Sequence, residues 1–206
     1  MSARKRVAIL ISGRGSNMRA LIKAARTPDY PAEIALVVSS SPDAEGLKFA
    51  RTAGVETAII DKARFGRSDQ DREAFDAELD AVLTRGRVEF ICLAGFMRIL
   101  SDAFVRKWQG RILNIHPSLL PAFRGLKPQA QALAAKVTVS GCTVHHVVPE
   151  LDAGPTIAQS EVPVLPDDTV ERLSARILEA EHRLYPEALK RVLTALAATR
   201  EGGSHT

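Results

Sequence analysis

The sequence predicts an α/β fold: a Rossmann-like, mostly parallel sheet with helices on both faces and an antiparallel strand pair in the C-terminal half. Two observations lead to this prediction. In the first half, short runs of β-branched residues alternate with amphipathic stretches, which is typical of βαβ units. In the second half, two such runs are joined by a loop too short for a crossover helix, so they should pair as antiparallel neighbours.

The elements of the first half alternate regularly between strand and helix. The expected strands are RVAILIS (6–12), EIALVVS (33–39), VETAII (55–60), EFICLA (89–94) and RILNIH (111–116). Residues 18–26, 44–53 and 71–85 lie between them and carry apolar residues at helical spacing. This order predicts a parallel sheet with helical crossovers.

The second half begins with the two strands expected to be antiparallel. These are GCTVHHVV (141–148) and PTIAQSEVPV (155–164), joined by PELDAG. The segment from residue 167 then opens with an Asp/Thr cap signal and continues with a helical pattern. Pro186 interrupts this pattern, and we expect a kink there or a break into two helices.

Composition indicates one soluble, cytoplasmic domain. A chain of 206 residues that is 46% hydrophobic can bury a sizeable core. Its apolar runs are far shorter than the roughly 20 residues that cross a bilayer, and MSARKR leads into the first strand without a cleavage site. Cys92 and Cys142 lie in apolar stretches, where thiols act as small buried hydrophobes and a reducing compartment suits them.

The charge balance does not favour nucleic acid as the partner. The 28 basic and 24 acidic residues give a net charge of +4, and the basic residues are scattered along the chain. An anionic small molecule can use a few of these charges equally well.

A glycine loop, SGRGSN (12–17), follows the first strand and opens the first helix. Free backbone N–H groups and the positive end of a helix dipole lie at such a position, and both favour phosphate. The third glycine of a dinucleotide fingerprint is replaced by Met18, and no Gly-Lys-Ser/Thr of a P-loop is present. The alternative is a glycine turn in which Ser16 and Asn17 only cap the helix.

Two polar residues, Asn114 and His116, end the strand of LNIHPSLLP. They project from the same face, and Pro117 stops the strand, so both lie at its carboxyl end. Open α/β sheets bind their ligands at that end. The alternative is a structural role for both residues: a buried histidine whose hydrogen bonds are satisfied within the core, and an asparagine whose hydrogen bonds hold a loop in place.

Asp152, in the loop PELDAG, is the third candidate because it can reach back over the edge of the sheet. A carboxylate near an imidazole favours the protonated ring, and a protonated ring beside an amide donor forms a site for a developing oxyanion. The alternative for Asp152 is a purely local role, in an Asx turn before Ala153 and Gly154.

Six motifs in chain order carry a family resemblance: ISGRGSN, LAGFMRIL, LNIHPSLLP, SGCTVHHV, ELDAGP and AEHRLYP. Together they resemble the phosphoribosylglycinamide formyltransferases, folate-dependent enzymes of purine synthesis. N-x-H-P-S-L-L-P is shared by the wider formyltransferase superfamily, whereas its combination with ISG-x-GSN and AGFMRIL is specific. The resemblance implies formyl transfer from N10-formyltetrahydrofolate to the amine of glycinamide ribonucleotide.

The resemblance also implies a role for each matching residue. Asn114, His116 and Asp152 match the catalytic trio. Gly15, Ser16 and Asn17 would hold the ribonucleotide phosphate through their backbone, and Glu181 would hold the ribose or amine end. The folate site would be lined by Arg72, Met97, Arg98, Ile99, Leu100, Asn114, Val148, Pro149, Glu150, Leu151 and Asp152. We expect one formyltransferase domain over residues 1–206, with the ribonucleotide site in its N-terminal half and the folate site in its C-terminal half. No clustered metal-ligand pattern is present, and we expect no metal.

The chain departs from the family pattern at three places. Gln129 stands at or near a position where the family usually has a histidine, and Leu178 stands where some relatives have a lysine near the phosphate. At the family's VHFV this chain reads VHHV. We expect His145 to be structural, and His146 is unexplained.

Three other functions remain open. A formyltetrahydrofolate hydrolase would use the same trio but would carry an extra N-terminal domain. A methionyl-tRNA formyltransferase would carry an additional C-terminal domain, and we expect neither domain here. A module that binds a phosphate ligand without catalysis predicts the glycine loop but gives no reason for Asn114, His116 and Asp152.

Overall fold

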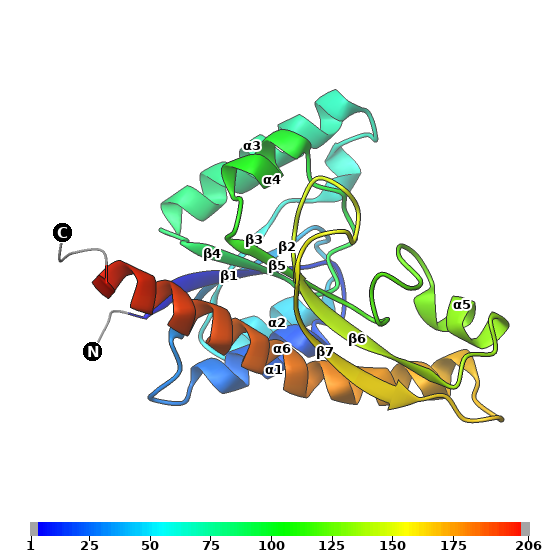
Figure 1. The fold of residues 1–206 in the computed structure, drawn as a ribbon. Helices are drawn as coiled ribbons and strands as arrows, with labels where there is room; N and C mark the ends of the chain where they lie inside the picture. Colours follow the sequence, from blue (N-terminus) through cyan, green and yellow to red (C-terminus); the bar gives the residue numbers. More distant parts are fainter. Residues whose placement is uncertain (1–3, 203–206) are drawn as a thin grey trace.

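The computed structural model describes residues 4–202, and its centre is one seven-stranded sheet, shown in Figure 1. The strand order is β3-β2-β1-β4-β5-β6-β7. The strands are β1 (Lys5–Ile11), β2 (Ala32–Ser39), β3 (Glu56–Ile59), β4 (Phe90–Leu93), β5 (Ile112–His116), β6 (Val139–His146) and β7 (Thr156–Pro163). The first five pair in parallel, and β6 is antiparallel to both β5 and β7. The predicted fold class is confirmed.

Helices cover both faces of this sheet (Figure 1). They are α1 (Ser16–Ala25), α2 (Glu45–Thr52), α3 (Asp69–Arg85), α4 (Asp102–Lys107), α5 (Pro128–Ala134) and α6 (Val170–Gly202), with a 3₁₀ turn, η1, at Lys62–Arg64. The three helices predicted in the first half are α1, α2 and α3. The short helices α4 and α5 have no counterpart in the sequence-based prediction.

Alternating side chains of the central strands divide the core into two layers. In β1, Val7, Ile9 and Ile11 pack into the layer that includes α1, α2 and α6. Ala8 and Leu10 point to the other face and pack into the layer that includes α3 and α4. A strand buried on both faces reads as a continuous apolar run, which is why VAILI has no polar alternation.

Of the two outcomes expected at Pro186, the break into two helices is wrong. One helix, α6, runs from Val170 to Gly202 with Pro186 inside it. Tyr185, Ala188 and Leu189 are each at most 2% exposed, and they belong to the core layer between α6 and the sheet. Burial of a large apolar side chain contributes about 1.5–3 kcal/mol. Several such contacts offset the roughly 3 kcal/mol that an interior proline costs.

Among residues 4–202, the structure contains no helix that is both long enough and apolar enough to span a membrane.

Candidate active site

Three loops meet at the carboxyl edge of the parallel strands. They follow β1, β4 and β5, which are neighbours in the sheet. Hydrogen bonds tie the first two together: the Ser12 N–H donates to the Gly95 carbonyl at 3.1 Å, and the Met97 N–H donates to Ser12 Oγ at 2.8 Å. This edge is where open α/β sheets bind ligands.

The structure brings the predicted trio together at the end of β5. Asn114 and His116 lie two residues apart on one face of the strand. Asp152 comes from the loop between β6 and β7, and its Oδ2 lies 3.4 Å from His116 Nδ1. Both side chains of this pair are less than 10% exposed.

Both ring nitrogens of His116 face oxygen atoms that only accept. Nε2 lies 2.9 Å from the backbone carbonyl of Phe123, and Nδ1 faces the Asp152 carboxylate. Each nitrogen can therefore donate a hydrogen to one of these oxygens. A ligand oxygen must replace the Phe123 carbonyl before it can receive the Nε2 hydrogen.

The Asp152 loop is held back over the sheet by contacts distant in sequence. Asp152 has a left-handed backbone with φ 49°, and its Oδ2 accepts from the Gly125 N–H at 2.9 Å. A Cβ at Gly154 would lie 1.8 Å from the His146 carbonyl oxygen, so only glycine allows this close approach. The Asp152 carboxylate therefore links its own loop to the loop that contains Gly125. This contact is distant in sequence, unlike the local Asx turn that was the alternative.

His145 also belongs to this group, although we expected it only to be structural. It pairs with Asn114 across β5 and β6 and is 2% exposed. Its Nε2 lies 3.2 Å from Asn114 Nδ2 and 3.7 Å from Asp152 Oδ1. Burial lowers the pKa of His145, against the opposing effects of its bond to the His146 backbone and of the Asp152 charge.

The glycine loop opens α1 without a side-chain cap. Gly15 is the N-cap residue, with a left-handed backbone of φ 68°. The first helical bond runs from the Arg19 N–H to the Gly15 carbonyl, so the N–H groups of Ser16 and Asn17 precede the helical ladder and remain available to an anion. The Asn17 side chain does not cap the helix, because its Nδ2 donates to Glu181 Oε2 at 2.7 Å.

Glu181 lies beside the glycine loop although it is far away in sequence. It is 6% exposed, and burial raises the pKa of its carboxyl group while the bond from Asn17 opposes that change. Within the described part of the chain, Asn17 Oδ1 is buried without a hydrogen-bond partner. The loop thus combines backbone donors with a free side-chain acceptor.

The residues expected to line the folate site have different environments. Met97 and Ile99 are more than half exposed, whereas Leu100 is buried. The Arg98 guanidinium lies over the Phe75 ring at 4.3 Å and donates to the Asp71 carbonyl, so its side chain anchors the loop to α3. Arg72 forms an ion pair with Asp69 on the same helix.

The second segment expected at the folate site, residues 148–152, is separated from the end of β6 by one residue. Leu151 is 57% exposed. Phe96 and Val147, which precede the two segments, pack against the same core layer as α3 and α4. The residues before both segments are therefore anchored in the core layer beneath α3, the helix that carries Arg72.

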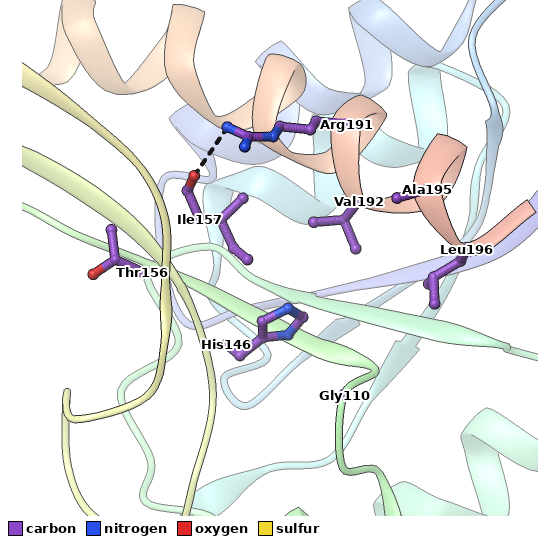
Figure 2. Close-up of a pocket in the computed structure, with 8 residues that line it drawn as sticks. All are labelled: Gly110, His146, Thr156, Ile157, Arg191, Val192, Ala195 and Leu196. Atoms are coloured by element: carbon purple, nitrogen blue, oxygen red, sulfur yellow. Dashed lines mark hydrogen bonds between the residues drawn. The ribbon is translucent and has the colours of Figure 1, made fainter. Parts of the chain in front are cut away.

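A separate cavity of about 500 Å³ lies near the other end of β5, and Figure 2 shows the residues that line it. Gly110 precedes that strand, and His146 pairs with Leu113 near its start. The His146 ring points into the cavity toward α6, where Val192 and Leu196 face it (Figure 2). The second histidine of VHHV thus lines this cavity, away from the trio.

The family model described as formyl transferase matches residues 5–189 of this chain. The trifunctional purine biosynthetic protein adenosine-3 of Gallus gallus is 52% identical over 198 residues, which cover 96% of this chain and 19% of that protein. The chain therefore spans about a fifth of the length of these trifunctional relatives.

Relatives of similar length agree with this match. Phosphoribosylglycinamide formyltransferase of Escherichia coli K12 is 43% identical over 180 residues, covering 87% of this chain and 83% of that protein. The crystal structure of glycinamide ribonucleotide transformylase 1 from Symbiobacterium toebii superposes with a TM-score of 0.89 at 46% identity, covering 95% of this chain and 90% of that one. The chain belongs to the formyl transferase family, among the relatives named phosphoribosylglycinamide formyltransferase.

Proposed function

We propose that this chain transfers a formyl group from N10-formyltetrahydrofolate to the amine of glycinamide ribonucleotide, a step of purine biosynthesis. The observation that carries the proposal is the Asn114, His116 and Asp152 group at the end of β5, on the same sheet edge as the glycine loop. One domain over residues 1–206 would hold both substrates. The relatives named phosphoribosylglycinamide formyltransferase support this choice of reaction.

The reaction needs an oxyanion site and a route for one proton. The neutral amine attacks the formyl carbon, and a tetrahedral oxyanion forms. Asn114 Nδ2 and the His116 ring donate hydrogen bonds to that oxyanion, while Asp152 faces the ring. As the bond between carbon and N10 breaks, the proton lost by the amine passes to N10 through water and Asp152.

Preorganised donors supply much of the expected rate enhancement. Loss of one oxyanion donor typically costs about 2.7–4 kcal/mol. Alignment of two bound substrates in one cleft contributes further, because a bimolecular step becomes effectively unimolecular. His116 is held by strand β5, and Asp152 is held by the hydrogen bond that it accepts from the Gly125 N–H. Both groups are therefore fixed in place before the substrates bind.

The phosphate of the ribonucleotide should bind at the start of α1. We expect the backbone N–H signals of Gly15, Ser16 and Asn17 to show the largest shifts when the protein is titrated with glycinamide ribonucleotide, because these donors precede the helical ladder. Inorganic phosphate should give the same pattern more weakly. Shifts concentrated elsewhere in an amide NMR spectrum would refute this assignment.

Arg72 should contribute to binding of the folate and not to binding of the ribonucleotide. We expect Arg72→Ala to raise the KM for the folate roughly tenfold, since a hydrogen bond to a charged group contributes about 1.5–3 kcal/mol. The ribonucleotide KM should stay near that of the unaltered protein. Arg85→Ala, at the other end of α3, is the matched control, and equal folate KM values for the two variants would contradict the assignment.

Incubation with both substrates, followed through the absorbance of the deformylated folate, tests the proposed reaction. Folate turnover that requires the ribonucleotide and yields the formylated amine is the expected result. Turnover without the ribonucleotide would indicate a hydrolase. Absence of turnover, with ribonucleotide bound, would indicate a binding module.

A further inference from the structure

We propose that His145 is a positioning residue for Asn114: it fixes the orientation of the Asn114 amide, so that an N–H group and not the carbonyl oxygen faces the developing oxyanion. This inference rests on the proposed formyl transfer. It assigns a role to a histidine that lies between the catalytic amide and the carboxylate.

The hydrogen bonds of His145 determine which ring nitrogen carries the hydrogen. Nδ1 lies 2.9 Å from the backbone carbonyl of His146, and because a carbonyl oxygen only accepts, Nδ1 must donate. In the neutral ring, Nε2 is then an acceptor. The group that faces Nε2 at 3.2 Å must therefore be the NH₂ of Asn114.

The hydrogen on His145 Nδ1 thus determines which end of the Asn114 amide faces the ring, and this follows without any assumption about which amide atom is oxygen and which is nitrogen. If the amide turned over, Asn114 Oδ1 would face the lone pair of His145 Nε2, and two acceptors would repel each other. One hydrogen of the NH₂ group is thus committed to His145, and the other remains for a ligand. Within residues 4–202, the Asn114 side chain shows no other hydrogen bond, and the residue is partly exposed.

The surroundings of His145 favour its neutral form. The charged or titratable groups that act on the ring are Asp152, His116 and His146. Asp152 Oδ1 lies 3.7 Å from Nε2, beyond hydrogen-bond distance. Burial outweighs the Asp152 charge and lowers the pKa of His145, so the ring acts as an acceptor at neutral pH.

The sheet holds this pair in register. Asn114 and His145 are directly opposite each other on β5 and β6, and His116 is opposite Thr143. Side chains opposite each other on antiparallel strands lie close together on one face. Thr143 Oγ1 donates to the Ser118 carbonyl at 2.7 Å and accepts from the Leu120 N–H at 3.0 Å, which also ties β6 to the chain that follows His116.

A double-mutant cycle between residues 145 and 114 tests the inference. We expect His145→Phe to lower kcat by roughly tenfold or more, with both KM values nearly unchanged, because only the oriented donor is lost. His145→Gln should retain most of the activity, since its side-chain oxygen can accept near the position of Nε2. In an Asn114→Ala background, His145→Phe should lower kcat less than about twofold, because the group that it orients is absent.

Equal losses from His145→Phe in both backgrounds would overturn the inference, and so would a Gln variant as slow as the Phe variant. Thermal unfolding of each variant is measured first. If His145→Phe does not fold, His145→Asn replaces it in the cycle, because its amide stays polar but is too short to reach Asn114. Formyl transfer by the unaltered protein tests the proposed function separately. If the unaltered protein does not transfer formyl, the proposed function fails; if it does and the cycle shows no coupling, only the role of His145 fails.

Discussion

Replacement of Asp152 by Asn should lower kcat for formyl transfer by about 10²- to 10⁴-fold, the usual range for loss of an acid–base group. Asn keeps the shape of the side chain and an oxygen for the Gly125 N–H, but it removes the charge that faces His116 at 3.4 Å. The effect should fall on kcat, because the interaction matters most when the oxyanion forms. Steady-state kinetics with both substrates saturating measure it.

The control for this variant is ribonucleotide binding. Calorimetry of Asp152→Asn should give the same affinity as the unaltered protein, because Gly15 to Asn17 lie in a different loop. A fall in ribonucleotide affinity as large as the fall in kcat would mean that Asp152 acts mainly in binding.

Asn114→Ala should lower kcat by about 10²- to 10³-fold, the loss expected for one oxyanion donor. Neither KM should change much, because the amide donates most strongly to the charged oxygen of the transition state. His146→Phe is a matched control next to the same strand, since its side chain points into the separate cavity of Figure 2. It should leave kcat near that of the unaltered protein.

A different pattern would contradict the role of Asn114. If Asn114→Ala raised the folate KM and left kcat intact, the amide would bind the folate in the ground state and would not stabilise the oxyanion.

The strands and the three longer helices of the first half could be predicted because their patterns extend over whole elements. The short helices could not: α4 and α5 have six and seven residues, too few turns for a periodic pattern to be recognised. The break considered at Pro186 does not occur, because helix propensity does not include the free energy that burial of Tyr185 and Leu189 contributes.

The sequence indicated Asn114 and His116 because both lie on one strand, where spacing alone predicts a shared face. His145 could not be placed beside them in the same way. Residues 117–138 separate β5 from β6, and no local pattern sets the register across so long a connection. The bond between Asn17 and Glu181 joins residues 164 positions apart, so only the resemblance to known sequences pointed to Glu181.

Single-turnover formyl transfer is the direct test of the proposed reaction and of the role of Asp152 in it. The unaltered protein and Asp152→Asn are saturated with both substrates, and the formyl group is followed by mass spectrometry from the folate to the ribonucleotide amine. We expect one formylated ribonucleotide for each folate consumed, and a chemical step at least about a hundredfold slower in the variant. Transfer by the variant at the unaltered rate would contradict the role of Asp152, and folate consumption without formylated ribonucleotide would contradict the proposed reaction.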